Sequence, residues 1–519
     1  MIVRIGNGLA DTYPLIRFLS DTSMASYFHL PPSARSHLLW AGGALTLGLL
    51  IAGLPIQYSG PLIVGAVVVG LSLWRPVFGL GCALLLGPTR AFLAAAGYAS
   101  LLFDLGQIFF ALALGSWLLR SAAERALMLP RLWLLFPLSL YVFVGLLSLL
   151  GALDWRDGFN EIIKWLEVIL TLLIAFDEAQ RGRLNWLLAA VLLTGLAQAG
   201  IGLWQYQLRG TGPDSFRLSE GVYRAYGSFE QPNPFGGFLG LIWPISAGLA
   251  IEGFRNLGRK KQTGDLPLST FYLPLLLISA VILLALYASF SRGAWLGAAA
   301  AGLVMAMFFP RRLSLGLGLG MVGLAGGWVL ISAGLLPASI AARFASLAEV
   351  ANFSDVRGVN TNDANFAIVE RLAHWQAALD MARAHPWLGV GLGNYGAAYS
   401  QYALFNWPLS LGHAHNIYLN ALAETGVFGL LAYLFIWVTT IGLTIRTLRR
   451  ATGWQRGLAL GLLGVWAHLL AHQVVDNLHV NNIDLLIATQ LGLLCALNMV
   501  GRRRTLRTYT EEMYNGRKS

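Results

Sequence analysis

Two histidines and an asparagine occupy the last polar positions before a long apolar run. His413, His415 and Asn416 precede about twenty residues that suit the hydrocarbon of a bilayer. A neutral imidazole accepts a proton from a hydroxyl near pH 7, so this placement predicts proton transfer at a membrane surface. The alternative is that both histidines are interfacial side chains with an apolar body and a polar tip.

Two arginines predict a second kind of chemistry. Arg292 lies between two apolar runs with Gly293 directly after it, and an arginine at mid-membrane costs about 2.5–3.5 kcal/mol on insertion scales. Arg224 lies in a Gly/Pro-rich segment just before another run. Guanidinium groups bind phosphate oxygens through paired hydrogen bonds, so two of them beside a histidine predict a phosphorylated substrate. Snorkelling of Arg292 to the interface and an ordinary solvated turn around Arg224 are the alternatives.

A third cluster has the spacing of metal ligands. His468, His472 and Asp476 fall on one face of a late apolar run, and His479 lies just beyond. The alternative to metal ligation is a hydrogen-bonded polar seam between helices. We expect no metal, because the sequence shows no further ligands. The glycine-rich run 386–395 follows no strand, so we expect a flexible turn toward His413 and His415 in place of a nucleotide loop.

The composition is that of a polytopic membrane protein. A hydrophobic fraction of 56%, a charged fraction of 12% and a mean hydropathy of +0.62 exclude a set of soluble domains. The net charge of +11 comes from residues spread between apolar runs, which indicates membrane topology and no nucleic-acid partner. Cys82 and Cys495 lie in apolar runs near opposite ends, so we expect no disulfide framework. Residues 1–37 lack a cleavable signal pattern, and we expect the first span to direct insertion.

The apolar runs predict an all-α polytopic membrane bundle of about 12–14 spans with a large, partly helical periplasmic loop. Basic residues concentrate in alternate connections and in the tail, which places both termini in the cytoplasm. We expect helices around 338–350 and 365–385, the second with an apolar stripe that packs on the protein or at the interface. The predicted parts are a cytoplasmic N-terminal segment (1–37), a first transmembrane part (38–335), an extracytoplasmic loop (336–412), a last transmembrane part (413–500) and a basic cytoplasmic tail (501–519).

With these residues in view, the chain resembles the bacterial O-antigen ligase and O-antigen polymerase superfamily. Four segments between about 220 and 430 carry the resemblance, and they occur in the family's order. They are Arg224-Ala-Tyr-Gly227-Ser-Phe with Pro232-Asn233, Ser289-Phe-Ser291-Arg292-Gly293, His385-Pro386-Trp-Leu-Gly389-Val-Gly391-Leu-Gly393-Asn394-Tyr395, and His415-Asn416-Ile-Tyr-Leu-Asn-Ala-Leu-Ala-Glu424-Thr-Gly426.

The resemblance implies transfer of a glycan from undecaprenyl pyrophosphate to a glycolipid or glycan acceptor. The reaction takes place at the outer face of the bacterial cytoplasmic (inner) membrane, without a cofactor and, for ligases, without a metal. Arg224 and Arg292 would hold the pyrophosphate, and His415 would activate or orient the acceptor hydroxyl. We expect five further residues to contact or support the substrate: Asn416, Glu424, Asn233, His413 and Arg371.

Several functions remain open at this point. The acceptor is a lipid A core oligosaccharide for a ligase, a second lipid-linked glycan for a polymerase, or a protein hydroxyl. The extended N-terminus and two further spans relative to the family leave this choice open. From other classes, a polysaccharide transporter or flippase predicts repeat symmetry, which the sequence does not show. A scaffold subunit of an envelope assembly predicts that Arg224, Arg292 and His415 are replaceable.

Overall fold

The computed structural model confirms the predicted all-α class. Its elements are helices apart from one short antiparallel hairpin, among the residues that it describes. The predicted segments 1–37 and 338–350 lie outside the described residues. Those residues are 41–515 without 44, 47, 50–54, 99–103, 126–129, 131, 258–268, 336–354, 363 and 364.

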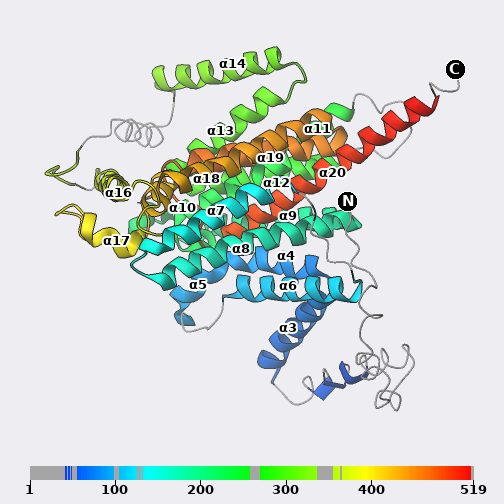
Figure 1. Ribbon diagram of the computed structural model, residues 1–519, viewed down its shortest axis with the longest axis horizontal. Coiled ribbons are helices and arrows are strands. Elements are labelled where there is room, and N and C mark those ends of the chain that lie inside the picture. The colour runs from blue at the N-terminus through cyan, green and yellow to red at the C-terminus, as the bar shows by residue number, and fades with distance from the viewer. Residues whose placement is uncertain are drawn as a thin grey trace, which may run out of the picture.

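The elements follow one another as a series of helices, with the α16 and α17 segment at one end of the bundle (Figure 1). The longer helices are α3 (Ile56–Trp74), α4 (Pro76–Leu86), α6 (Leu105–Ala123), α7 (Leu135–Ser148), α8 (Trp155–Glu178), α9 (Leu184–Gln207), α10 (Pro232–Gly240), α11 (Trp243–Leu257), α12 (Ser269–Ala288), α13 (Arg292–Phe308), α14 (Leu313–Ser332), α16 (Phe366–Ala384), α17 (Tyr395–Tyr402), α18 (Ile417–Arg450), α19 (Gly453–His472) and α20 (Ile483–Asn515). The short elements are η2 (Gly87–Thr89), α5 (Arg90–Leu93), η3 (Ala94–Tyr98), η4 (Leu149–Gly151), η5 (Ala179–Arg183), η6 (Asp214–Phe216), β1 (Arg217–Ser219), β2 (Val222–Tyr223) and η7 (Gly227–Phe229).

The bundle is polytopic by the length and composition of its helices. Six helical segments in the described part of the chain are long and apolar enough to cross a membrane. One of them, Trp155–Gln207, contains both α8 and α9, which turn at Gly182 with a φ of 83°. Shorter apolar helices, among them α12 and α13, accompany these six. The polytopic class is therefore confirmed, while the span number of about 12–14 stays a prediction.

The core forms where helices distant in sequence pack against one another. Helix α19 packs against α11 and α13, α20 packs against α8, and α18 packs against α7. Backbones approach closely where side chains are smallest, because a Cβ at Gly248 would lie 2.4 Å from the carbonyl oxygen of Gly457. Helix α14 stands apart from this body beside α13, and its apolar side chains are exposed, as expected for contact with lipid (Figure 1).

Three helices begin at the same end of the bundle, and each has a capping side chain. Asp154 caps α8 by accepting from Arg156 N at 2.7 Å, and Ser291 and Asn416 cap α13 and α18. Helices α16 and α17 lie at this end, whereas the last part of α20 extends from the opposite end (Figure 1). The capped end therefore gathers helix N-termini, whose dipoles favour negative charge nearby.

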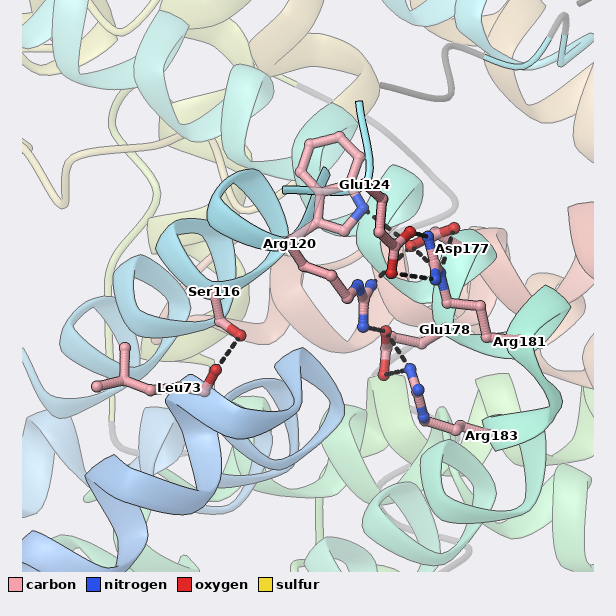
Figure 2. Close-up of polar contacts among 9 residues, drawn as sticks. Leu73, Ser116, Arg120, Glu124, Asp177, Glu178, Arg181 and Arg183 are labelled. Carbon is pink, nitrogen blue, oxygen red and sulfur yellow. Dashed lines mark hydrogen bonds and ion pairs between the residues drawn. The ribbon is translucent and has the colours of Figure 1, made fainter. Parts of the chain in front are cut away.

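The opposite end of α8 holds a network of ion pairs (Figure 2). Arg120 of α6 pairs with Asp177 at 2.8 Å and with Glu178 at 2.7 Å. Arg183 also pairs with Glu178 at 2.8 Å, and Arg181 bridges Asp177 and Glu124. The arginines predicted to face the cytoplasm thus lie together at the far end of α8 from its cap, where buried carboxylates neutralise them.

We expect Glu178→Ala to lower the free energy of unfolding by about 3–5 kcal/mol, because it removes the buried partner of Arg183 and one of the two buried partners of Arg120. Equilibrium unfolding of the detergent-solubilised protein measures the change. Glu124→Ala is the matched control: its carboxylate pairs with Arg181 but is 41% exposed, so its loss should cost about 1 kcal/mol or less. Equal destabilisation by the two variants would contradict a structural role for the buried part of the network.

Candidate functional site

The predicted arginines meet at one small cavity at the capped end of the bundle. The cavity has a volume of about 110 Å³, and its polar lining comes from segments far apart in the sequence. The charged and amide residues that line it are Arg224, Asn233, Arg292, Arg371 and Asp476. Three guanidinium groups therefore surround one cavity, and the carboxylate of Asp476 is the one acidic group in its lining.

Arg224 is fixed by the turn that joins α12 to α13. Its Nε donates to the Ser289 carbonyl at 2.9 Å, and its Nη2 lies 3.3 Å from the Phe290 carbonyl and 3.4 Å from Asn233 Oδ1. Phe290 has a φ of 49°, an unfavourable conformation for an aromatic residue. This strained turn explains how so few residues separate two apolar helices, and it aims the Arg224 side chain at the cavity.

Arg292 and Arg371 reach the cavity from two helices. Arg292 is the first residue of α13, directly after the Ser291 cap, so its guanidinium adds to the positive end of the helix dipole. Arg371 belongs to α16 of the predicted outer loop, and its buried Nε has no hydrogen-bond partner among the described residues. The cavity is consequently electropositive and offers donors for anionic oxygens.

His415 lies beside this cavity and contacts its carboxylate. His415 Nδ1 is 3.3 Å from Asp476 Oδ1, and the backbone N–H of His415 donates to His413 Nδ1 at 3.1 Å. His415 has a φ of 49°, a conformation that places it among the strained residues of the site. When Nδ1 carries the proton shared with Asp476, Nε2 is free to accept a proton from a hydroxyl.

The charges around the histidines are set by burial and by their neighbours. Burial opposes ionisation of Asp476, but the hydrogen bond to His415 and nearby positive charge, including that of Arg371, outweigh it and hold the pKa of Asp476 below its ordinary value. Burial, reinforced by the nearby His415, lowers the pKa of His413 to about 4. His413 is therefore neutral near pH 7 beside an ionised Asp476.

His374 is a member of this cluster that the sequence did not reveal. Its buried ring stacks on Tyr399 with centroids 4.5 Å apart, and its Nδ1 lies 3.0 Å from the Tyr395 hydroxyl. The ring centroid of His374 is 6.2 Å from that of His415. Burial lowers the pKa of His374 to about 4. The expected apolar stripe of α16 is present and buried, but it gave no sign that a histidine within it faces the site.

The structure gives Asp476 neighbours that the spacing of His468, His472 and Asp476 did not predict. The ring nitrogens of His468 and His472 are buried and have no hydrogen-bond partner among the described residues, so they form no hydrogen-bonded seam. Asp476 instead joins His413 and His415, and the ligand atoms of these three residues lie within 4.8 Å of one another. This triad, in the described part of the chain, has a composition that could hold a metal ion.

Asn416 and Glu424 accept hydrogen bonds from backbone N–H groups near the histidine segment. Asn416 Oδ1 caps α18 by accepting from the backbone N–H groups of Tyr418 at 3.0 Å and Leu419 at 3.1 Å. The buried Glu424 accepts from the backbone N–H of Tyr395 at 3.1 Å. Neither residue lines the arginine cavity, so direct contact between them and a substrate stays a prediction.

The glycine-rich run 386–395 is docked against α18 and is not the loose turn expected from its composition. Gly391 N donates to the Glu424 carbonyl at 2.9 Å, and Val427 N donates to the Pro386 carbonyl at 2.9 Å. Helix α18 is interrupted there by Gly426, whose φ is 63°. A Cβ at Gly389 would lie 2.3 Å from the carbonyl carbon of Glu424, so only glycine permits this approach.

We expect the free energy of unfolding to fall as the pH is lowered from about 6.5 to 4. His374 and His413 bind no proton in the folded protein over this window, because both pKa values are lowered to about 4. The unfolded chain protonates them, so acid favours unfolding. His374→Phe keeps an aromatic ring stacked on Tyr399 but cannot bind a proton. It should therefore reduce the pH dependence of the free energy of unfolding, measured by equilibrium unfolding. His385→Gln, at an exposed histidine, is the control, and an unchanged slope in His374→Phe would refute the assignment.

The family comparison falls on the same region of the chain. Residues 277–434 match the family model described as O-antigen ligase. This segment contains Arg292, Arg371 and both site histidines, while Arg224 and Asp476 lie outside it. No curated protein matches the chain. Residues 277–434 are therefore similar to the O-antigen ligase family, which supports the resemblance read from the four sequence segments.

Proposed function

We propose that this protein is an O-antigen ligase that moves a glycan from undecaprenyl pyrophosphate to a hydroxyl of a lipid A core oligosaccharide. The match of residues 277–434 to the O-antigen ligase family supports a glycosyltransferase-type enzyme with lipid-linked substrates in a membrane. The observation that carries the proposal is the electropositive cavity beside the His415–Asp476 pair. A diphosphate leaving group carries several negative charges and needs such a cavity, and an acceptor hydroxyl needs a nearby base.

The arginines stabilise the negative charge of the leaving group. As the bond between the anomeric carbon and the phosphate oxygen breaks, negative charge grows on the pyrophosphate. Arg224 is already fixed by the α12–α13 turn and Arg292 by the start of α13. Donors that need no rearrangement stabilise the transition state more than the ground state, so they accelerate the step. Arg371 adds a third positive charge from the outer loop.

His415 removes the proton from the acceptor hydroxyl. The acceptor oxygen bonds to the anomeric carbon while its proton passes to His415 Nε2, and the pyrophosphate departs with the electron pair of the broken bond. Asp476 orients the imidazole through Nδ1 and stabilises the positive charge that the imidazole gains. A direct displacement of this kind inverts the anomeric configuration.

The proposal includes an orientation in the membrane. The arginines near Asp177 and Glu178 lie at the end of α8 opposite its Asp154 cap, whereas the site lies at the capped end. With the basic end toward the cytoplasm, the site faces outward and both termini are cytoplasmic. The loop 336–412, through α16, then covers the site from the outer side, in keeping with the proposed division of the chain at 335 and 413.

We expect His415→Ala and Arg292→Ala to reduce glycan transfer by at least about 100-fold, because one removes the base and the other a fixed donor to the leaving group. Transfer is measured with the purified full chain, an undecaprenyl-pyrophosphate-linked glycan and lipid A core oligosaccharide.

Matched controls use exposed residues at the same end of the molecule. His385→Ala and Arg383→Ala remove the same side-chain types from an exposed histidine and from an arginine that is 74% exposed, and both should keep transfer within twofold of wild type, the scatter expected for surface changes. Wild-type rates in His415→Ala or Arg292→Ala would refute the catalytic assignment. Transfer to a second carrier-linked glycan, and none to the core oligosaccharide, would make the protein a polymerase.

We expect a chelator to leave transfer unchanged, although His413, His415 and Asp476 could hold a metal. Two of the potential ligand nitrogens already take part in hydrogen bonds within the cluster, His413 Nδ1 with the His415 N–H and His415 Nδ1 with Asp476. Added Zn²⁺ should inhibit by displacing these contacts. Transfer measured with EDTA, and again with zinc restored, decides the point: loss with EDTA and recovery with zinc would establish a catalytic metal at this triad.

A further inference from the structure

A cavity lined by arginines and apolar side chains lies at the end of the bundle opposite the site. It has a volume of about 350 Å³, within the roughly 300–1,000 Å³ that small-molecule sites occupy. Helices α13 and α18 both begin at the site end and pack against α19. The α13–α18–α19 cavity lies where α13 and α18 end and α19 begins. Its lining consists of Met307, Phe308, Pro310, Arg311, Leu448, Arg449 and Arg456.

This cavity is separate from the arginine cavity of the site. Helix α13 carries Arg292 at its first position and Phe308 at its last, 17 residues in all. At about 1.5 Å per residue, roughly 25 Å of helix lies between the two cavities. They share no lining residue. The α13–α18–α19 cavity therefore has no part in the chemistry at His415.

Arg456 gives the cavity a wall that is fixed before any ligand binds. It is 3% exposed, and its Nη1 donates to Glu252 Oε2 at 2.7 Å. Its Nη2 donates to the Phe309 carbonyl at 2.7 Å and to the Phe308 carbonyl at 3.2 Å. These carbonyls at the end of α13 have no partner within the helix, so Arg456 satisfies them and holds α13 against the start of α19.

Two further arginines line the cavity without a carboxylate of their own. Arg311 lies in the short connection between α13 and α14, and Arg449 lies in the last turn of α18. Both are exposed, and neither pairs with a carboxylate in the part of the chain that the structure describes. The helix dipole favours arginines near the last turns of α13 and α18. It leaves the guanidinium donors of Arg311 and Arg449 available to an anion.

The charge balance here differs from that of the ion-pair network at the end of α8. That network sets three arginines against three carboxylates (Figure 2). Around the α13–α18–α19 cavity, Arg255 lies 3.7 Å from Glu252 and shares this carboxylate with Arg456. Together with Arg311 and Arg449, four positive charges meet one negative charge among the described residues, an excess of three. Such an excess attracts an anion.

The rest of the lining favours an anion that carries a hydrocarbon chain. Four apolar residues line the cavity beside the arginines: Met307, Phe308, Pro310 and Leu448. A free inorganic anion gains nothing from these side chains, whereas an amphiphile buries apolar surface on them. The basic connections of the sequence place this end of the bundle at the cytoplasm, where the membrane leaflet contains anionic phospholipids.

We propose that the α13–α18–α19 cavity binds an anionic phospholipid of the cytoplasmic leaflet. The phosphate lies between Arg311 and Arg449, whose guanidinium groups donate paired hydrogen bonds to its oxygens. The first part of an acyl chain lies against Phe308 and Leu448. This binding does not depend on the proposed glycan transfer. It ties together the ends of α13 and α18, the two helices that begin beside Arg292 and His415.

Arg311→Gln and Arg449→Gln test the proposal, because both side chains are exposed. The full chain is purified in neutral detergent and titrated with phosphatidylglycerol, and native mass spectrometry counts the bound lipid. We expect each variant to weaken binding about fivefold, and the double variant about 25-fold, since each change removes one positive charge beside the headgroup. Phosphatidylcholine, whose headgroup has no net charge, should bind wild type at least about tenfold more weakly than phosphatidylglycerol.

Arg312→Gln and Arg450→Gln are the matched controls. Each removes the same charge from the next residue along the chain, which is exposed but does not line the cavity, so each should keep phosphatidylglycerol binding within about twofold of wild type. Equal losses in control and cavity variants would reveal a general attraction to the basic surface and overturn the proposal.

A competition with inorganic phosphate separates the two sources of a phosphate group. A large excess of inorganic phosphate should leave phosphatidylglycerol bound, because the free anion makes no apolar contact. Displacement of the lipid by inorganic phosphate would make this a site for a soluble anion and would also overturn the proposal. A protein that binds the lipid as expected but transfers no glycan would refute the proposed function and leave this site standing.

Discussion

The contact between His415 and Asp476 is the interaction on which the arrangement of the site depends. It joins the segment before α18 to the loop after α19, and Asp476 of that loop also lines the arginine cavity. Without it, the imidazole has no partner that fixes its tautomer, and the loop loses its side-chain contact with His415. Burial opposes ionisation of the Asp476 carboxylate, so its hydrogen bond with His415 at 3.3 Å and the nearby positive charge lower its pKa by compensating for lost hydration.

A division of charge along the bundle supports this contact. At the basic end, arginines and carboxylates are paired: Arg120 with Asp177 and Glu178, and Arg456 with Glu252 at 2.7 Å. At the site, three arginines share a cavity with one carboxylate, and helix N-termini point the same way. At the basic end these carboxylates neutralise the arginines paired with them, whereas at the site the excess of arginines leaves a positive potential that a ligand can meet. The same residue type therefore stabilises the fold at one end and is available for chemistry at the other.

Much of this could be predicted from the sequence, and the failures have physical reasons. Apolar run length gave the all-α membrane class, whereas the strained turn before Arg292 was not predicted. The grouping of Asp476 with His468 and His472 was incomplete, because helical spacing reports one face of one helix and the helix ends before Asp476, which also reaches His413 and His415. His374 was missed, because a histidine among apolar residues has the same pattern whether it faces a core or a site. The docking of 386–395 against α18 depends on backbone contacts with Gly426, which no local pattern encodes.

The most direct test of the account is an experimental structure of the full chain with undecaprenyl pyrophosphate bound in a lipid nanodisc. The account predicts that the diphosphate lies among Arg224, Arg292 and Arg371, with guanidinium nitrogens within hydrogen-bond distance of its oxygens. His415 should face the side of the diphosphate to which a sugar would be attached. A diphosphate bound at the opposite, basic end of the bundle, or outside the arginine cavity, would contradict it.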